Sequence, residues 1–577
     1  MIVKRIVNKL VWYADRALSR IYHARHPGPF ERRLIMAAAP LTLACQPNDK
    51  WNLHVHAPRW VEAVKCAPLT PLPRPKSIFI FCTFRGVFTT HLVLAVLLAW
   101  RGHKVTIGYL PKIQGPGKPP LIEHSSARPY LHSIMSRIGD LTKGAITCVD
   151  LYDDQRSAPV DSNFVIRQSR YDTIMTKQKE TLDFADSEVK RFHELMAQSG
   201  EKTQIVINNH FRDHRYDVCI VGNGTTYDGA HACYVIKQLG QSVNATEKFA
   251  FRGVRVINHG DHFLAGDDLD YVWQERDRFG YTREPYYSKF LDKARESILE
   301  RSRNSTKTWL WELQHAVNQS ERDALKAANI PEDQPFILVC PNVVFDAGYG
   351  KITNIFPTMS DWLVETIKFL RERSSHLIVV RAHPGEGLYW GGKEPVHEVL
   401  SRHDIVPDDR LIIVPGQARV NTYRLMERCL FGVVFSSSTG LEMAVMGKQV
   451  VTASDIFYAN RGFTQDAADR DDYFRQLAAV ANQNEVAGLD AARGERALLF
   501  YFVYHWVMQY PYPYDKPSWI ARRPPAKLLG SMDMKPFLPY LDLITMDARE
   551  FREEAHRYLS AEQILRRIET FDWRAYA

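Results

Sequence analysis

Short apolar runs alternate with amphipathic segments along most of the chain. The runs that read as buried strands are residues 77–83, 104–110, 217–223, 254–257, 336–340, 377–380, 411–415 and 432–435. The segments whose apolar positions recur with helical spacing are residues 90–100, 229–239, 360–372, 421–429 and 441–446. This alternation predicts an α/β fold with parallel sheets and right-handed crossovers. Ligands of such sheets bind in the loops beyond the strand ends.

The chain is too long for one hydrophobic core. At 577 residues it exceeds the size at which single domains usually stop growing, so at least two domains are expected. We divide it into a basic amphipathic segment (1–26), a first Rossmann-like domain (27–325), a second one (326–480) and a helical tail that packs back on both (481–577).

Two segments raise the question of a membrane. Residues 1–26 have apolar positions at helical spacing with interspersed lysines and arginines, which predicts either an interfacial helix on the inner membrane leaflet or a helix packed on the first domain. The aromatic run 497–508 is too short to cross a bilayer. We expect it to be a buried helix at the domain interface, with a membrane-facing patch as the alternative.

The segment 432–447 is the strongest candidate for ligand chemistry. A short strand is followed by Ser437, Ser438 and Thr439, which supply hydroxyls and a helix N-cap, and Gly447 ends the helix. A helix N-terminus presents unpaired amides and partial positive charge, which favours a phosphate. Glu442 lies one turn into the helix, where we expect its carboxylate to accept hydrogen bonds from ribose hydroxyls. The alternative is an ordinary capped helix.

A second cluster follows the strand at 377–380. Arg381, His383 and Pro384 come directly after it, and an imidazole beside a guanidinium at a strand end predicts an anion site. Asn342, after the strand at 336–340, faces the same crevice in this interpretation. Each of these residues alone is equally compatible with ordinary loop chemistry.

The order of these motifs resembles the capsule-polysaccharide glycosyltransferases of the Kdo-transferase group, which are distantly similar to bacterial sialyl- and polysialyltransferases. The residues that carry the resemblance are Arg381, His383, Pro384, Ser437, Ser438, Thr439, Gly440, Glu442, Gly447, Lys448, Val450, Phe457, Tyr458, Gly462 and Thr464. The resemblance spans about 150 residues. It implies a GT-B fold, in which two Rossmann-like domains face each other across a cleft, with the donor in the C-terminal half and no required metal.

The resemblance also implies an acidic general base beside a glycine in the first domain. The local text here is NHGDH, so His259 takes the position of an acid and Asp261 follows two residues later. Either side chain is chemically able to accept a proton from an acceptor hydroxyl, and Asp261 could also orient His259. The alternative is that the histidines of this loop are structural.

The amino-acid composition indicates which kinds of ligand and partner the protein can bind. A net charge of +8 suits anionic donors, acidic glycans or a membrane surface, but no basic block with interleaved aromatic residues indicates nucleic acid. The eight scattered cysteines predict reduced thiols in a cytoplasmic protein. The acidic cluster of Asp267, Asp268 and Asp270 lacks partner ligands, so we expect a solvated loop and no metal or other cofactor.

Together these observations predict an inverting, metal-independent transfer of a sugar from a nucleotide-activated donor to a cell-surface or capsular glycan or glycolipid. By resemblance the donor is CMP-Kdo or another CMP-linked acidic sugar. We expect the protein to work in the cytoplasm, with association with the inner face of the membrane as a further hypothesis. Two alternatives stay open. One is a glycerophosphotransferase or nucleotide-sugar epimerase on the same fold, and the other is a non-catalytic partner in polysaccharide assembly or export.

Overall fold

The structure is a computed structural model of the full chain. It describes residues 72–570 apart from residues 73, 85–86, 114–134, 137, 155, 249–253, 261–265, 304–318, 347–354, 388–391, 486–487 and 513–534. The amphipathic segment 1–26 and Asp261 therefore lie outside the described residues.

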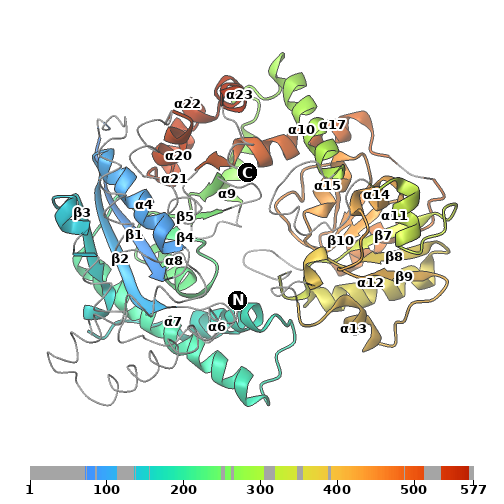
Figure 1. The fold of residues 1–577 in the computed structure, drawn as a ribbon, viewed down its shortest axis with the longest axis horizontal. Helices are drawn as coiled ribbons and strands as arrows, with labels where there is room; N and C mark the ends of the chain where they lie inside the picture. Colours follow the sequence, from blue (N-terminus) through green and yellow to red (C-terminus); the bar gives the residue numbers. More distant parts are fainter. Residues whose placement is uncertain are drawn as a thin grey trace, which may run out of the picture.

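The first half of the chain forms a seven-stranded sheet (Figure 1). Its strands are β1 (Ser77–Phe84), β2 (Lys104–Ile113), β3 (Ile146–Asp150), β4 (Val218–Gly222), β5 (Val243–Lys248), β6 (Val254–Asn258) and β13 (Tyr510–Pro511). They lie in the order β13-β6-β5-β4-β1-β2-β3, and the pairs from β5 to β3 are parallel. The two pairs made by β6 are antiparallel.

Helices α4 (Val87–Trp100), α6 (Ser162–Lys177), α7 (Ser187–Asp213) and α8 (Tyr227–Gln238) belong to this first sheet. Asp161 and Asp186 precede α6 and α7, and their carboxylates accept hydrogen bonds from the first turns. Side-chain capping of this kind satisfies amides that have no partner within the helix. It explains why both helices begin where they do.

The second half forms a fully parallel six-stranded sheet. Its strands are β7 (Phe336–Cys340), β8 (Leu377–Arg381), β9 (Leu411–Val414), β10 (Gly432–Val434), β11 (Val450–Thr452) and β12 (Gln465–Asp466). Their order is β12-β11-β10-β7-β8-β9. The helices that connect them are α12 (Met359–Arg373), α13 (Val396–Ser401), α14 (Thr422–Arg428) and α15 (Thr439–Val445), and α16 (Arg470–Ala481) follows β12.

The chain passes between the two sheets twice, and both crossings lie at the same end of the molecule (Figure 1). The outward crossing runs through α9 (Asp267–Gln274), α10 (Tyr286–Ser302) and α11 (Glu321–Ala327), and the return runs through α17 (Ala491–Phe502). Helix α10 packs against α17 and α15, and α11 packs against α14. These two helices therefore belong with the second sheet, although the sequence division placed residues up to 325 in the first domain.

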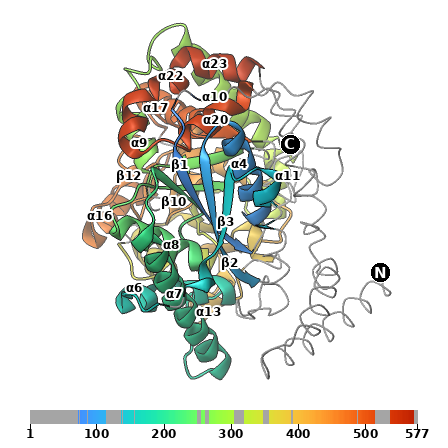
Figure 2. The same cartoon turned by 90° about the vertical axis from the view of Figure 1, so that its left-hand side faces the viewer.

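The tail returns to the first sheet. Strand β13 pairs with β6, and helices α20 (Leu538–Leu543), α21 (Ala548–Glu554), α22 (His556–Leu559) and α23 (Ala561–Thr570) lie over one end of that sheet (Figures 1 and 2). The aromatic run 497–508 is buried except for Tyr504, which is half-buried, so it is core and not a membrane-facing patch. No helix among the described residues is long and apolar enough to cross a membrane.

The predicted α/β fold with two Rossmann-like sheets is confirmed. Helix α6 and strand β5 were not predicted, because their polar and mixed sequences lack a clear apolar period. The exact domain boundaries and the behaviour of residues 1–26 stay predictions.

Candidate functional site

The candidate donor residues follow three neighbouring strands of the second sheet. Strand β7 lies between β10 and β8, and all three are parallel, so the loops after them share one edge. From β7 the chain proceeds to β8 and β9 on one side, and β10 to β12 lie on the other. The edge beyond β7 and β10 is therefore the topological switch point, where open α/β sheets bind ligands.

A direct hydrogen bond joins the two loops at the switch point. The Asn342 side-chain oxygen accepts a hydrogen bond of 3.2 Å from the Ser436 amide. This contact fixes the loop after β7 against the turn after β10. Asn342 was predicted to face this crevice, and the structure brings it to the serine-rich turn.

Ser437, Ser438 and Thr439 differ in what they offer a ligand. Ser437 is buried, its hydroxyl donates to the Thr439 hydroxyl at 3.0 Å, and it accepts from the Thr439 amide. It therefore caps the helix internally. Ser438 is exposed and makes no side-chain cap, and Thr439 is half-buried. Of these three residues, Ser438 and Thr439 thus have the hydroxyls that a bound group can reach.

His383 lies in the loop after β8, and its tautomer can be derived from its contacts. Its Nδ1 accepts a 3.0 Å hydrogen bond from the Gly385 amide, so in the neutral ring the proton is on Nε2. Burial, with a smaller contribution from the Arg381 charge, lowers the pKa of His383 to about 4. At neutral pH the ring is therefore an uncharged Nε2–H donor. Pro384 begins a short 3-10 turn, Pro384–Gly387, that holds this loop.

Arg381 does not face a ligand, contrary to its predicted role in an anion site. It is 3% exposed, and its guanidinium donates to the Thr422 hydroxyl and to the carbonyl oxygens of Pro415 and Ala418. Its side chain therefore holds the loop that follows β9 next to the loop that follows β8. A β-branched or apolar residue could not make these bonds, so Arg381 is a structural residue of the site.

Glu442 is paired inside the protein. Its carboxylate lies 3.1 Å from the Arg301 guanidinium, and both side chains are about nine-tenths buried. Arg301 also donates to the Tyr501 hydroxyl at 3.1 Å. The contact joins α15 to the crossing helices α10 and α17. Arg301 was not identified from the sequence, because it reaches Glu442 from a helix about 140 residues earlier and no local motif marks it.

His259 cannot act as the general base in this arrangement, which corrects one of the two catalytic assignments. Its Nδ1 lies 2.7 Å from the Asp268 carboxylate and its Nε2 lies 2.8 Å from the Leu543 carbonyl oxygen. Both partners are acceptors, so both ring nitrogens carry protons and neither lone pair is free. Burial lowers the pKa of His259, but Asp268 and the Leu543 carbonyl more than offset this and the net shift is upward. Asp261 stays a prediction.

The acidic cluster after this loop was predicted to be a solvated loop, and this prediction is wrong. Asp267, Asp268 and Asp270 form the first turn of α9, where carboxylates are favourable. Asp268 pairs with His259, and Asp270 pairs with Arg461 of the second sheet's loops. Among the described residues, no group of three or more His, Cys, Asp or Glu side chains is arranged to hold a metal ion.

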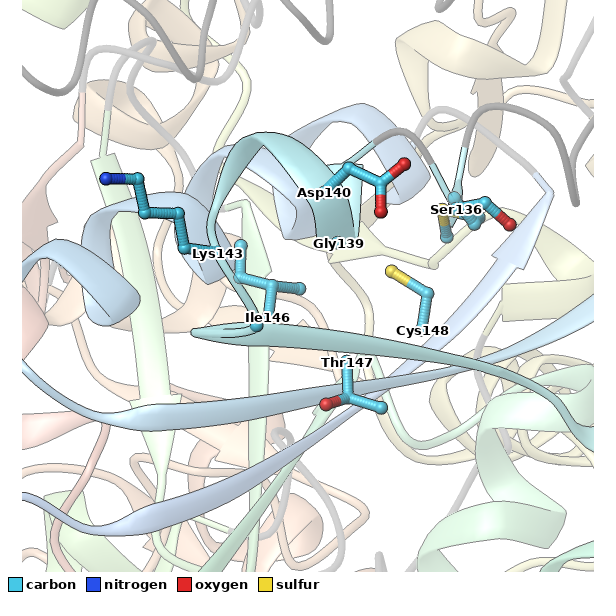
Figure 3. Close-up of a pocket in the computed structure, with 9 residues that line it drawn as sticks. Ser136, Gly139, Asp140, Lys143, Ile146, Thr147 and Cys148 are labelled. Atoms are coloured by element: carbon cyan, nitrogen blue, oxygen red, sulfur yellow. The ribbon is translucent and has the colours of Figure 1, made fainter.

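A separate ≈ 520 Å³ pocket lies at the β3 edge of the first sheet (Figure 3). Asp140, Lys143 and Cys148 are among its lining residues, and Figure 3 shows the Cys148 sulfur and the Asp140 carboxylate on the same side of the strand. Burial raises the pKa of the Cys148 thiol to about 12, so it is not a reactive thiolate. The pocket is on the opposite side of the molecule from the switch point of the second sheet and shares no residue with it.

Comparisons with known proteins locate a family in the second half of the chain. Residues 274–491 match the family model for capsule polysaccharide biosynthesis proteins. No curated protein matches the sequence. The matched segment includes Asn342, His383 and the turn after β10.

The solved structures that match the chain have low sequence identity and low TM-scores. They include the beta Kdo 2,4 transferase KpsC of Thermosulfurimonas dismutans (13% identity, 50% of this chain and 78% of that chain, TM-score 0.32). UDP-GlcNAc 2-epimerase of Methanocaldococcus jannaschii (10%, 73% and 98%, TM-score 0.24) and the calicheamicin glycosyltransferase CalG4 (12%, 78% and 97%, TM-score 0.24) are two others. Similarities at this level assign neither an activity nor a substrate.

The family match and the two sheets lead to one conclusion, which the sequence motifs had predicted. Residues 274–491 match the family of capsule polysaccharide biosynthesis proteins, and the chain has the two Rossmann-like domains of a GT-B fold.

Proposed function

We propose that this chain is a glycosyltransferase of capsule polysaccharide assembly, which moves a sugar from a nucleotide-activated donor to a glycan or glycolipid acceptor. One observation carries the proposal. Asn342, His383 and the Ser436–Thr439 turn follow three adjacent strands and converge at the switch point of the family-matched sheet. Capsule polysaccharides are built by sugar transfer, so a nucleotide-sugar site fits this family.

The donor phosphate is the group these residues are best suited to bind. When the bond to the anomeric carbon breaks, negative charge grows on the leaving phosphate. The Ser438 and Thr439 hydroxyls and the neutral Nε2–H of His383 are uncharged donors, and donors fixed in place before the reaction stabilise such charge. We propose transfer with inversion and without a metal, from CMP-Kdo or a related CMP-linked acidic sugar, as in the resembling enzymes.

Asp261 is the proposed general base. Asp261 comes two residues after His259 in the sequence. Both ring nitrogens of His259 are hydrogen bonded, so a different side chain has to accept the proton of the attacking hydroxyl, and a carboxylate can do so. His259 then serves to anchor the loop through Asp268 and Leu543. We further propose that residues 1–26 contact the inner membrane leaflet, where a lipid-linked acceptor would be presented.

A second candidate is favoured by one observation. The NHGDH loop lacks the family's acid, and His259 is committed to an internal ion pair. A chain with a donor site but no base would bind nucleotide and serve as a non-catalytic partner in polysaccharide assembly or export.

Nucleotide binding followed by turnover separates the two candidates. Thermal shifts measured with CMP, CDP, UDP and GDP show which nucleotide stabilises the chain, and hydrolysis or transfer from CMP-Kdo shows chemistry. The transferase predicts stabilisation by CMP and release of CMP from the donor. Binding without turnover on any glycan acceptor favours the partner, and no binding of any nucleotide rejects both.

A variant pair makes the binding test specific. Ser438→Ala removes an exposed hydroxyl at the turn and should weaken CMP binding severalfold with little change in melting temperature. Ser320→Ala is the control, because Ser320 caps α11 away from the site and its loss should leave CMP binding unchanged.

A further inference from the structure

The two sheets are joined by hydrogen bonds at a place far from the chain crossings. The turn after α6 contributes Glu180, whose carboxylate accepts from the Met359 amide (2.8 Å), the Ser360 amide (3.1 Å) and the Ser360 hydroxyl (2.6 Å). Met359 and Ser360 open helix α12 of the second sheet. A carboxylate from the first domain thus caps a 15-residue helix of the second domain.

The second domain returns the same kind of contact. The Glu394 carboxylate accepts from the Glu180 amide (2.7 Å) and the Thr181 amide (3.2 Å). The Lys393 amide donates to the Gln178 carbonyl oxygen at 2.8 Å. Each domain therefore supplies one carboxylate that binds backbone amides of the other. We call the two glutamates with these partners the carboxylate exchange.

The carboxylate exchange is placed to hold the two domains together. Both crossings of the chain lie at the end that contains α10 and α17, whereas α6 lies at the other end of the face between the domains (Figure 1). If one domain rotated about the crossings, the end of α6 would separate from α12 by more than any pair of residues in contact near α10 would separate. Breaking the exchange would leave the α12 amides and the Glu394 carboxylate without these partners, which costs free energy.

The exchange is also connected to the candidate donor site. A Cβ atom at Gly392 would lie 3.5 Å from Val343 and 3.9 Å from the Gln178 carbonyl oxygen, so this short segment fits between the loop after β7 and the turn after α6. Val343 follows Asn342 directly. The Glu386 carboxylate, in the turn that begins at Pro384, accepts from the Val396 amide at 3.0 Å. The segment around Glu394 is therefore fixed to both donor-site loops.

We infer that Glu180 and Glu394 are positioning residues that hold the two domains in the arrangement needed for sugar transfer. This inference rests on the proposed function. The proposed donor residues lie on the second sheet, and the proposed base comes shortly after β6 of the first sheet in the sequence, so we infer that the reacting groups meet only when the domains are held at a fixed distance. The carboxylate exchange sets that distance at the end away from the crossings.

A cysteine pair measures this closure without reference to activity. Gln178→Cys and Lys393→Cys are placed where the two backbones hydrogen bond, so the rate of disulfide formation in oxidised glutathione reports how often the segments meet. We expect Glu180→Ala or Glu394→Ala to slow that rate at least tenfold. Glu188→Ala is the matched control, because Glu188 is 83% exposed and pairs with Lys177 of its own domain. The chain without the cysteine pair gives the background.

The activity measurement uses the same variants without added cysteines. Glu180→Ala should lower kcat for transfer about tenfold while CMP affinity stays unchanged, and Glu180→Gln, which keeps one acceptor oxygen, should fall between. A merely structural role would lower the melting temperature and leave both the disulfide rate and kcat unaltered, which would overturn the inference. If the unchanged chain binds no nucleotide, the proposed function fails, and the disulfide rates still decide whether the exchange holds the domains.

Discussion

The Tyr458 hydroxyl donates a 2.6 Å hydrogen bond to the Ser437 carbonyl oxygen, and the same phenol occupies the space where a side chain at Gly440 would lie. An added Cβ at Gly440 would stand 2.2 Å from the Tyr458 oxygen. Tyr458 is fully buried, so it cannot move aside easily. Tyr458, from the loop after β11, therefore packs against the serine-rich turn and fixes its conformation.

This support predicts a coupled pair of substitutions. Gly440→Ala should destabilise the chain by about 2–3 kcal/mol through overpacking. Tyr458→Phe should cost about 1 kcal/mol, because it removes one hydrogen bond to the Ser437 carbonyl, which still accepts from the Gly440 amide. Because removing the phenol oxygen relieves the worst contact, the double variant should cost less than the sum of the singles. Urea unfolding of the four proteins gives the coupling, and strict additivity would show that the two residues do not touch.

The buried ion pair of Arg301 and Glu442 predicts a large asymmetry between single and double substitutions. Glu442→Gln leaves the Arg301 charge buried without its partner and should cost about 3–5 kcal/mol of unfolding free energy. Arg301→Met with Glu442→Leu removes both charges and should cost much less. If Glu442→Gln instead lowers CMP affinity while the unfolding free energy is unchanged, the carboxylate binds ribose, as the sequence had suggested.

Buried neutral histidines predict a loss of stability in acid. Burial is the main cause that lowers the pKa of His91 to about 3 and that of His210 to about 4. In the unfolded chain these histidines bind a proton near pH 6.5, whereas in the folded chain they stay neutral. The free energy of unfolding is therefore highest above pH 6.5 and decreases as the pH falls towards 4. At pH 5 each of these two histidines should lower the free energy of unfolding by about 2 kcal/mol relative to pH 7.

The check is urea unfolding at both pH values. His91→Leu cannot take up a proton, so it should reduce the difference between pH 7 and pH 5 by about 2 kcal/mol. The exposed His397 is the control, and His397→Gln should leave the difference unaltered. An unchanged difference in His91→Leu would mean that His91 is not kept neutral by burial.

His259 should respond to pH in the opposite direction. Although burial opposes it, Asp268 raises the pKa of His259 on balance, so the stabilisation from this pair is present below pH 6.5 and is lost as the pH rises through the folded pKa. His259→Gln should therefore lower the unfolding free energy at pH 6 by about 3 kcal/mol.

Asp261→Asn should abolish transfer with little effect on stability. Loss of kcat in His259→Gln at unchanged stability would restore His259 as the base.

The fold could be predicted because it depends on local patterns. The strands of the second sheet are nearly continuous apolar runs between small polar residues, and this pattern specifies a parallel sheet. The convergence of Asn342, His383 and the serine-rich turn followed from the rule that parallel strands end at one edge. Helix α6 was missed because 5 of its 16 residues are buried and most of these are polar.

The roles of individual side chains could not be predicted, because their partners come from distant parts of the chain. Glu442 and Arg381 were predicted to bind the donor, but Arg301 and the carbonyl oxygens after β9 hold these two side chains inside the protein. His259 is committed by Asp268 and by Leu543, which lies 284 residues away. A motif shows which residue types gather at a site, and only the tertiary contacts show which of them stay free for a ligand.

We propose that a donor nucleotide binds at the switch point of the second sheet. The most direct measurement is a crystal structure of the full chain with CMP. We expect a phosphate within hydrogen-bonding distance of the Ser438 and Thr439 hydroxyls and of His383 Nε2. A nucleotide bound elsewhere, or a phosphate that makes no contact with this turn, would contradict it.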